Sequence, residues 1–278
     1  MNVTKADGEK VPFDAGKIRR SLRRVKVKPS MIEQIIDEVE LEIYEAIPTS
    51  KLYRFVFKKL KKLQRGIAGR YHLKRAIMDL GPTGFPFEGL IAGLWSTEGF
   101  ATKTGQIVKG FCVDHEVDVI AEKADLHYLT ECKFHSFQGK PCDVKHALYV
   151  YGRFLDIEKR LRSKATHSDR IHKMWLVTNT RLTTDAVSYG TCAGLGLLSW
   201  DFPAGNALRE RVDRSGLHPI TCLTSLSGKE KRQLLAKFIV LCRDLCAKPQ
   251  LLIEIGMEES KITKVLEEAD AICGTTER

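Results

Sequence analysis

Apolar residues recur every three or four positions through much of the first 80 residues, which is the period of helices that bury one face. Before them, residues 3–14 place short β-prone runs on either side of Asp7-Gly8, a pair that favours a tight hairpin turn. Asp14 can then cap the first helix, because its side chain can accept a hydrogen bond from the helix start. We therefore expect a hairpin followed by four helices, in segments 15–25, 31–43, 48–63 and 67–77.

Beyond Gly81-Pro82 the pattern alternates between helical and strand-like periods. Two short apolar runs, 117–120 and 129–133, fit a hairpin that turns near residues 123–125. A later strand, helix and strand predict a right-handed crossover with parallel neighbours. The segment therefore predicts a mixed sheet with an antiparallel hairpin and parallel later strands. The expected helices span 87–95, 143–157 and 184–189, and the expected strands 102–108, 117–120, 129–133, 174–178 and 195–200.

The last 70 residues are helical in pattern. They predict a helix over 226–248, a short helix at 251–255 and a final helix over 258–271. The last two faintly resemble a helix–hairpin–helix DNA-binding unit, but acidic residues crowd them, and acids repel phosphate. We therefore expect a packing or dimerisation module. The fold class predicted for the whole chain is α/β and α multi-domain, divided into residues 1–80, 81–205 and 206–278.

Composition narrows the cellular setting. No apolar run approaches the roughly 18 residues of a membrane span, and the N-terminus has no apolar signal-peptide core. The eight cysteines include no CxxC pair and no Cys/His set at zinc spacing, which indicates free thiols in a reducing compartment. We therefore expect a soluble, cytoplasmic protein with no membrane partner.

The net charge of +10 is concentrated in one part of the chain. Residues 1–80 hold 19 Lys and Arg against 10 Asp and Glu, whereas the remaining 198 residues are close to balanced. A basic N-terminal domain suggests phosphate groups, either of a nucleotide or of a nucleic acid.

Three residues on the two hairpin strands carry the candidate chemistry. Glu131 and Lys133 are two positions apart on one strand, so their side chains point to the same face. Asp118 on the preceding strand can join them at one end of the sheet. Two adjacent carboxylates keep their charges at low cost only with a cation between them, and oxygen ligands suit Mg²⁺ or Mn²⁺. The alternative interpretation is that these three residues lie on an exposed strand face and form only an ion pair.

The spacing Asp118-x12-Glu131-x-Lys133 resembles the PD-(D/E)xK nuclease signature, with Val117 in place of the proline. Residues 84–200 as a whole resemble the Mrr-like restriction endonuclease domain. The resemblance implies a metal site at Asp118 and Glu131, a charge-stabilising role for Lys133, and a supporting role for Glu88 on the preceding helix. It also implies DNA as the substrate. His115-Glu116, His135 and Lys145 lie nearby in sequence, and we interpret them as turn, loop or helix-start residues.

Residues 1–80 resemble the ATP-cone domain of ribonucleotide reductases and their regulators. The matching motifs are Val-x-Lys-x-Asp-Gly, Phe-Asp-x-x-Lys-Ile and the run from Arg70 to Ile77. The resemblance implies binding of ATP or dATP as an effector, and a role in oligomerisation. Ala6 departs from the family, which commonly has a second basic residue there. The residues that the resemblance assigns to the nucleotide are Lys5, Asp14, Lys17, Thr49 and Lys74.

Together these patterns predict a Mg²⁺-dependent DNA endonuclease of the restriction or defence type, controlled or assembled through ATP or dATP. Cutting both strands of a duplex would require a homodimer or a higher oligomer. The alternative hypothesis is a non-catalytic nucleotide-sensing scaffold or regulator in which the acid–lysine cluster is vestigial. A ribonuclease or a nickase with the same site is a third possibility.

Overall fold

The chain begins with the hairpin that the Asp7-Gly8 turn predicts. In the computed structural model, which describes residues 1–163 and 170–274, β1 (Asn2–Thr4) pairs antiparallel with β2 (Lys10–Pro12). Gly8 in the turn takes a φ of 88°, where a side chain would be strained. A further strand, β3 (Ile47–Pro48), pairs parallel with β1 and completes a small three-stranded sheet.

Helices α1 (Ala15–Arg24), α2 (Pro29–Glu42) and α3 (Thr49–Leu63) follow the predicted segments. Asp14 caps α1 as expected, since its carboxylate accepts a hydrogen bond of 2.8 Å from the Gly16 backbone N–H. The core between these helices contains fully buried aliphatic side chains, which is what the helical period of the sequence encodes. The most buried of them are Leu22, Ile32, Ile36, Val39, Val56 and Leu60.

The prediction of one continuous helix over 67–77 is wrong. The structure has two short helices, α4 (Arg65–Tyr71) and α5 (Leu73–Met78). The break lies at His72, whose backbone N–H donates to the carbonyls of Ala68 and Gly69 at 2.9 and 3.2 Å. A helix end of this kind needs neither proline nor glycine, so no residue type marks it in the sequence.

The prediction of one helix over 226–248 is also wrong. The structure has α10 (Gly228–Ala236) and α11 (Cys242–Ala247), followed by α12 (Gln250–Glu254) and α13 (Glu259–Cys273). Phe238 takes a φ of 60°, which ends the first helix. The residues after it hydrogen-bond to an earlier segment, because Ile220 N–H donates to the Val240 carbonyl at 2.8 Å. Tertiary backbone pairing therefore overrides helical propensity here.

The C-terminal helices belong to the same compact unit as the N-terminal ones. This unit contains Met1–Ala76 together with the segment from His218, and the second unit is Ile77–Leu217. Helix α13 packs on α4, and the contact is close because two glycines of α4 face it. A Cβ atom on Gly66 would lie 2.8 Å from the Ala271 Cβ, and one on Gly69 would lie 2.5 Å from Ile272 Cδ1. The C-terminal segment therefore packs on the N-terminal helices of the same chain. The structure divides the chain into two compact units, whereas the sequence suggested three consecutive segments.

The second unit is built on a five-stranded sheet in the order β4-β5-β6-β7-β8. The pairs β4–β5 and β5–β6 are antiparallel, whereas β6–β7 and β7–β8 are parallel, as the sequence pattern predicts. The strands are β4 (Ala101–Lys109), β5 (Asp114–Lys123), β6 (Leu126–Lys133), β7 (Ile171–Thr178) and β8 (Gly196–Leu198).

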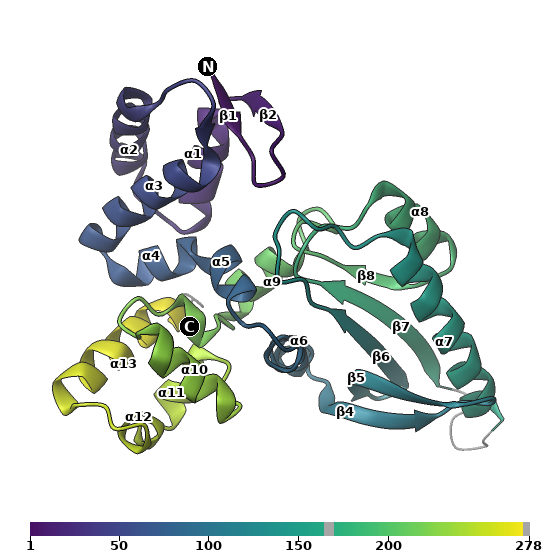
Figure 1. Ribbon diagram of the computed structural model, residues 1–278. Coiled ribbons are helices and arrows are strands. Elements are labelled where there is room, and N and C mark those ends of the chain that lie inside the picture. Colours follow the sequence, from purple (N-terminus) through teal and green to yellow (C-terminus); the bar gives the residue numbers. More distant parts are fainter. Residues whose placement is uncertain (164–169, 275–278) are drawn as a thin grey trace. The chain divides into compact units, whose positions relative to one another are not determined.

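Helices cover both faces of this sheet (Figure 1). Helix α6 (Phe85–Thr97) lies on one face, where Trp95 donates a hydrogen bond of 3.2 Å to Thr130. Helices α7 (Val144–Arg162) and α8 (Thr184–Cys192) lie on the other, and α7 buries Ala147 and Val150. The unit ends with α9 (Leu208–Ser215), a helix the sequence pattern did not predict.

The fold class predicted from sequence is confirmed: a small sheet with helices, a five-stranded mixed sheet, and a helical C-terminal region. Among the helices of residues 1–163 and 170–274, none combines the length and apolarity that crossing a bilayer requires.

Candidate functional site

The hairpin β5–β6 brings the two predicted acids together. Val119 pairs with Thr130 across the hairpin, so Asp118 lies opposite Glu131 when the register continues by one residue. Asp118 Oδ2 accepts a hydrogen bond of 2.6 Å from the Cys132 backbone N–H, which fixes this carboxylate against β6. Lys133 is two residues beyond Glu131 and therefore shares its face of the strand, as predicted.

Four carboxyl groups from three elements surround this point. Burial, the charge of Asp118 and then those of Glu116 and Glu131 raise the pKa of Glu88 to about 7. Burial and the nearby Glu131 raise the pKa of Asp118 to about 6, although the hydrogen bond from Cys132 lowers it. Glu88 comes from the first turn of α6, and the other acids come from β5 and β6. The helix glutamate that the sequence suggested therefore does reach the electrostatic neighbourhood of the strand acids.

An arginine that the sequence analysis missed completes the cluster. The Arg153 guanidinium on α7 donates to Glu131 Oε2 and to the Glu116 backbone carbonyl. Its side chain is 10% exposed, so this ion pair is largely removed from water. Tyr149, one turn earlier on α7, stacks over the guanidinium at 5.3 Å from the ring centroid. No motif marks Arg153, because its approach depends on how α7 lies across the sheet.

The negative charge of this cluster favours a bound cation, but the side chains are not arranged as a complete set of metal ligands. The raised pKa values of Asp118 and Glu88 reflect burial first and the charges of the neighbouring acids second, and a divalent ion would offset both. In the part of the chain that the structure describes, however, no three His, Cys, Asp or Glu side chains are arranged to hold a metal. Mg²⁺ commonly uses only one or two carboxylates together with water and a substrate phosphate. Asp118 and Glu131 fit that requirement if Arg153 releases Glu131.

The other polar residues considered from sequence have structural partners. His115 lies 2.8 Å from Asp156 on α7, and this contact lowers the pKa of Asp156. The backbone N–H of His135 donates to Asn179 at 2.8 Å, and its buried ring has a pKa lowered to about 4 by desolvation. Lys145 lies exposed in the first turn of α7. These positions agree with the interpretation of His135 as a loop residue and of Lys145 as a helix-start residue. The interpretation of His115 and Glu116 as turn residues is wrong, because both lie within β5.

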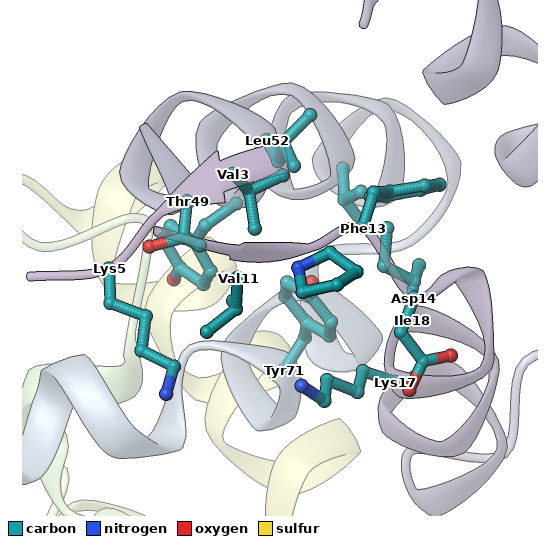
Figure 2. Close-up of a pocket in the computed structure, with 13 residues that line it drawn as sticks. Val3, Lys5, Val11, Phe13, Asp14, Lys17, Ile18, Thr49, Leu52 and Tyr71 are labelled. Carbon is teal, nitrogen blue, oxygen red and sulfur yellow. The ribbon is translucent and has the colours of Figure 1, made fainter. Parts of the chain in front are cut away.

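A second candidate site lies in the N-terminal unit. A pocket of about 290 Å³ opens between the hairpin, α1 and α3. Lys5, Asp14, Lys17 and Thr49 line it, which brings together four of the five residues assigned to the nucleotide. Figure 2 shows the Lys5 and Lys17 side chains extending toward the same side of the pocket. Lys74, on α5, is not among the lining residues.

The walls of this pocket are apolar and aromatic. Tyr53 and Tyr71 stack with ring centroids 5.5 Å apart and ring planes 7° apart. Tyr53 also stacks with Phe57, at 5.9 Å and 14°. Burial raises the pKa of Tyr71 to about 12, so its hydroxyl stays neutral. Two of the polar groups already have partners, since Lys5 lies 2.6 Å from Glu9 and Asp14 caps α1. Tyr71 is not among the residues that the ATP-cone resemblance assigns to the nucleotide.

Comparison with known proteins gives two matching family models. Residues 1–78 match the ATP cone domain, and residues 218–273 match the family described as AF1548-like, C-terminal. An uncharacterized protein of Archaeoglobus fulgidus is 35% identical over 185 residues, which is 66% of this chain and all of that protein. The chain belongs to the AF1548-like family.

The structural comparison agrees. The crystal structure of AF1548, a protein of unknown function, matches with a TM-score of 0.57 and 33% sequence identity. The match covers 70% of this chain and all of that one. The AF1548-like model begins at residue 218, which is also where the chain rejoins the first compact unit. The ATP-cone prediction is thereby confirmed, whereas the resemblance to Mrr-like endonucleases still rests on the motif and on the site geometry.

Proposed function

We propose that this AF1548-like protein is a metal-dependent DNA endonuclease whose activity is controlled by ATP or dATP at the ATP-cone domain. The observation that carries the proposal is the convergence of Asp118 and Glu88, whose pKa values are raised, with Glu131 and Lys133. Such clusters of mutually repelling acids are costly for a fold, and perturbed pKa values of this kind are concentrated at functional sites.

Each residue has a role in this mechanism. Mg²⁺ or Mn²⁺ held by Asp118 and Glu131 would activate water and offset the charge of the scissile phosphate. Lys133, on the same strand face, is positioned to stabilise negative charge that develops on the phosphate oxygens. Glu88, with a pKa of about 7, can accept the proton of the attacking water near neutral pH. Arg153 can exchange Glu131 for a phosphate oxygen, a partner that guanidinium binds well.

The control step is assigned to the pocket in the N-terminal unit. Lys5 and Lys17 provide two positive charges at one side of an otherwise apolar pocket, which suits a polyphosphate attached to a base. We further propose that ATP or dATP binding sets the assembly state, because cutting both strands of a duplex needs two active sites. A homodimer or a higher oligomer would supply them.

A nucleotide-sensing scaffold is the second candidate. The ion pair between Arg153 and Glu131 favours it, because this contact already neutralises one of the acids without a metal. In that case the ATP-cone domain would bind nucleotide, and the acidic cluster would only stabilise the second unit.

DNA cleavage separates these two functions. Plasmid DNA would be incubated with Mg²⁺ and the wild-type protein, the Lys133→Ala variant or the Lys103→Ala variant, each with and without ATP and dATP. Lys103 is an exposed lysine of β4 and serves as the matched control. We expect the wild type and Lys103→Ala to cut, and Lys133→Ala to cut at least about 100-fold more slowly, as for loss of one electrostatic stabiliser.

The outcomes are distinct. Cutting that changes with ATP or dATP would join the two sites in one function. Cutting that Lys133→Ala leaves intact would place the reaction elsewhere. Nucleotide binding with no cutting of plasmid or of modified DNA would favour the scaffold.

A further inference from the structure

One face of α7 carries exposed aromatic and cationic side chains. Five residues of this face recur every three or four positions, which is the spacing of neighbours on a helix surface: Lys145, Tyr149, Gly152, Asp156 and Lys159. Tyr149 is 63% exposed, and a Cβ atom added to Gly152 would meet nothing within 4 Å. The middle of this face is therefore open to solvent.

Two aromatic rings lie along this face, and each has a cation against it. The Arg153 guanidinium carbon lies 5.3 Å from the centroid of the Tyr149 ring. Phe111, from the turn between β4 and β5, is 55% exposed, and Lys159 Nζ lies 3.7 Å from its ring centroid. The Phe111 backbone N–H donates to the Asp156 carbonyl at 3.0 Å, which attaches the turn to the helix. Both rings are therefore held in place by the fold and are still exposed to solvent.

The charge of this face favours an anionic ligand. The Asp156 carboxylate accepts hydrogen bonds from the backbone N–H groups of Cys112 and Val113, at 2.8 and 3.3 Å, and lies 2.8 Å from His115. These donors offset its negative charge. Lys145 and Lys159 are exposed toward the two ends of the face, so its outer parts are positively charged.

The length and the position of this face suit a strand of nucleic acid. Tyr149 and Lys159 are ten positions apart, which is about 15 Å along a helix. That distance equals about four stacked nucleotides at roughly 3.4 Å each. Arg153, beneath the Tyr149 ring, donates to Glu131, so the face adjoins the acidic cluster. Aromatic rings that stack on bases, next to cations that bind the backbone, are typical of proteins that bind single strands.

We propose that this face of α7, together with Phe111, binds an unpaired strand of DNA beside the acidic cluster. One base stacks on Tyr149 and another on Phe111, while Lys145 and Lys159 bind phosphates. Gly152 has no side chain and leaves room for the strand between the rings. The inference rests on the proposed nuclease function for the choice of DNA, and it assigns DNA with a single-stranded segment as the substrate class.

A second copy of the chain is the competing occupant, because exposed apolar patches also mark protein interfaces. Two observations favour the nucleic acid. The exposed lysines match the charge of phosphates, whereas lysine is depleted at protein interfaces. Each exposed ring also has a cation beside it, which places a base-stacking group next to a phosphate-binding group.

The test measures binding without a divalent ion, so the result does not depend on cutting. The full chain would be titrated in EDTA into a fluorescein-labelled oligothymidylate of about 12 nucleotides, and fluorescence anisotropy would be followed. We expect Tyr149→Ala and Tyr149→Leu each to weaken binding about 10-fold, because a base stacks on a ring and not on an aliphatic side chain. Tyr149→Phe should bind as the wild type does, and Phe111→Ala should weaken binding by a similar factor to Tyr149→Ala.

Tyr44→Ala is the matched control. Tyr44 is also an exposed tyrosine, with Lys51 Nζ 5.5 Å from its ring centroid, but it lies in the other unit and should not affect binding. The salt dependence tests the phosphate contacts. Lys159→Gln should reduce the slope of log affinity against log salt by about 0.7, and Lys28→Gln, in the other unit, should leave it unchanged.

Four results would overturn the proposal: equal affinity of the wild type and Tyr149→Ala, binding to a duplex of the same length as tight as to the single strand, tighter binding to oligouridylate than to oligothymidylate, or self-association of the chain that Tyr149→Ala abolishes. The third result would assign the face to RNA, and the fourth would assign it to a second copy. Plasmid cutting with Mg²⁺ is measured separately, so a failure of single-strand binding is distinguishable from a failure of the nuclease function.

Discussion

The two candidate sites differ in how their charges are set. Lys5 lines the ATP-cone pocket, and its side chain is 36% exposed to solvent. In the acidic cluster the charges are partly buried, so the pKa values of Asp118 and Glu88 rise to about 6 and about 7. The pocket is therefore ready for a ligand of opposite charge without strain on the fold. In the acidic cluster, burial and the neighbouring acids disfavour the charged carboxylates, and a cation would offset both.

The comparison explains why the two sites were recognisable by different means. The pocket lies within residues 1–78, which match the ATP cone domain model, so sequence similarity identifies it. The acidic cluster lies in residues 77–217, and there the relatives are proteins of unknown function. Its meaning therefore depends on geometry and electrostatics.

After the loss of DNA cutting expected for Lys133→Ala, the largest expected effect is on nucleotide affinity. Lys17→Ala should weaken ATP binding by about 10–100-fold, because it removes one charge-assisted contact to the phosphates. Lys74→Ala distinguishes the pocket from the family assignment, since Lys74 does not line the pocket and should change affinity much less. Calorimetric titration with ATP measures both, and Lys28→Ala, an exposed lysine of the same unit, is the control. Equal losses for Lys74→Ala and Lys17→Ala would mean that the nucleotide extends beyond this pocket.

The next effect is on stability as a function of pH. The pKa of Asp118 is raised from 3.8 to about 6, so folding favours its protonated form. Its contribution to stability is fully present below about pH 4 and is lost as pH rises through about 6. Asp118→Asn should therefore reduce the loss of stability between pH 5 and pH 8 by on the order of 1–2 kcal/mol.

Urea unfolding of both proteins at the two pH values measures this difference. Asp185→Asn, a change in the first turn of α8, is the control for removing a carboxylate elsewhere in the same unit. Parallel pH profiles for the wild type and Asp118→Asn would contradict the view that burial and the neighbouring acids raise the pKa of Asp118.

The smallest effect concerns the packing that joins the C-terminal helices to the ATP-cone domain. Gly66→Ala would place a Cβ 2.8 Å from the Ala271 Cβ and 3.3 Å from its backbone, so α4 and α13 must move apart. We expect a loss of about 1–2 kcal/mol. Gly152→Ala, in α7 with open space around it, should instead gain about 0.5–1 kcal/mol. Thermal unfolding compares the two, and a gain for Gly66→Ala would disprove the close contact.

Local periodicity predicted much of the acidic site and little of its surroundings. The period of two placed Glu131 and Lys133 on one face, and the hairpin turn near Ala124 brought Asp118 beside them. Glu116 and Arg153 could not be predicted in their roles, because they depend on the end of β5 and on the path of α7.

The same limit applies to the fold. The strand Ile47–Pro48 is too short to show a period, and its pairing with β1 spans more than 40 residues. The apolar run after Phe238 resembles a helix, but its backbone pairs with residues near His218. Long-range pairing of this kind leaves no local trace in the sequence, so the joining of the first and last segments was not foreseen.

The central claim is that the acidic cluster is a cation site distinct from the nucleotide pocket. Calorimetric titration with Mn²⁺ at pH 8, above the raised pKa of Asp118, tests it on the wild type, Asp118→Asn and Lys17→Ala. We predict one Mn²⁺ site in the wild type and in Lys17→Ala, and its loss in Asp118→Asn. Mn²⁺ binding that Asp118→Asn leaves unchanged would contradict the claim, and so would a wild-type protein that binds no Mn²⁺.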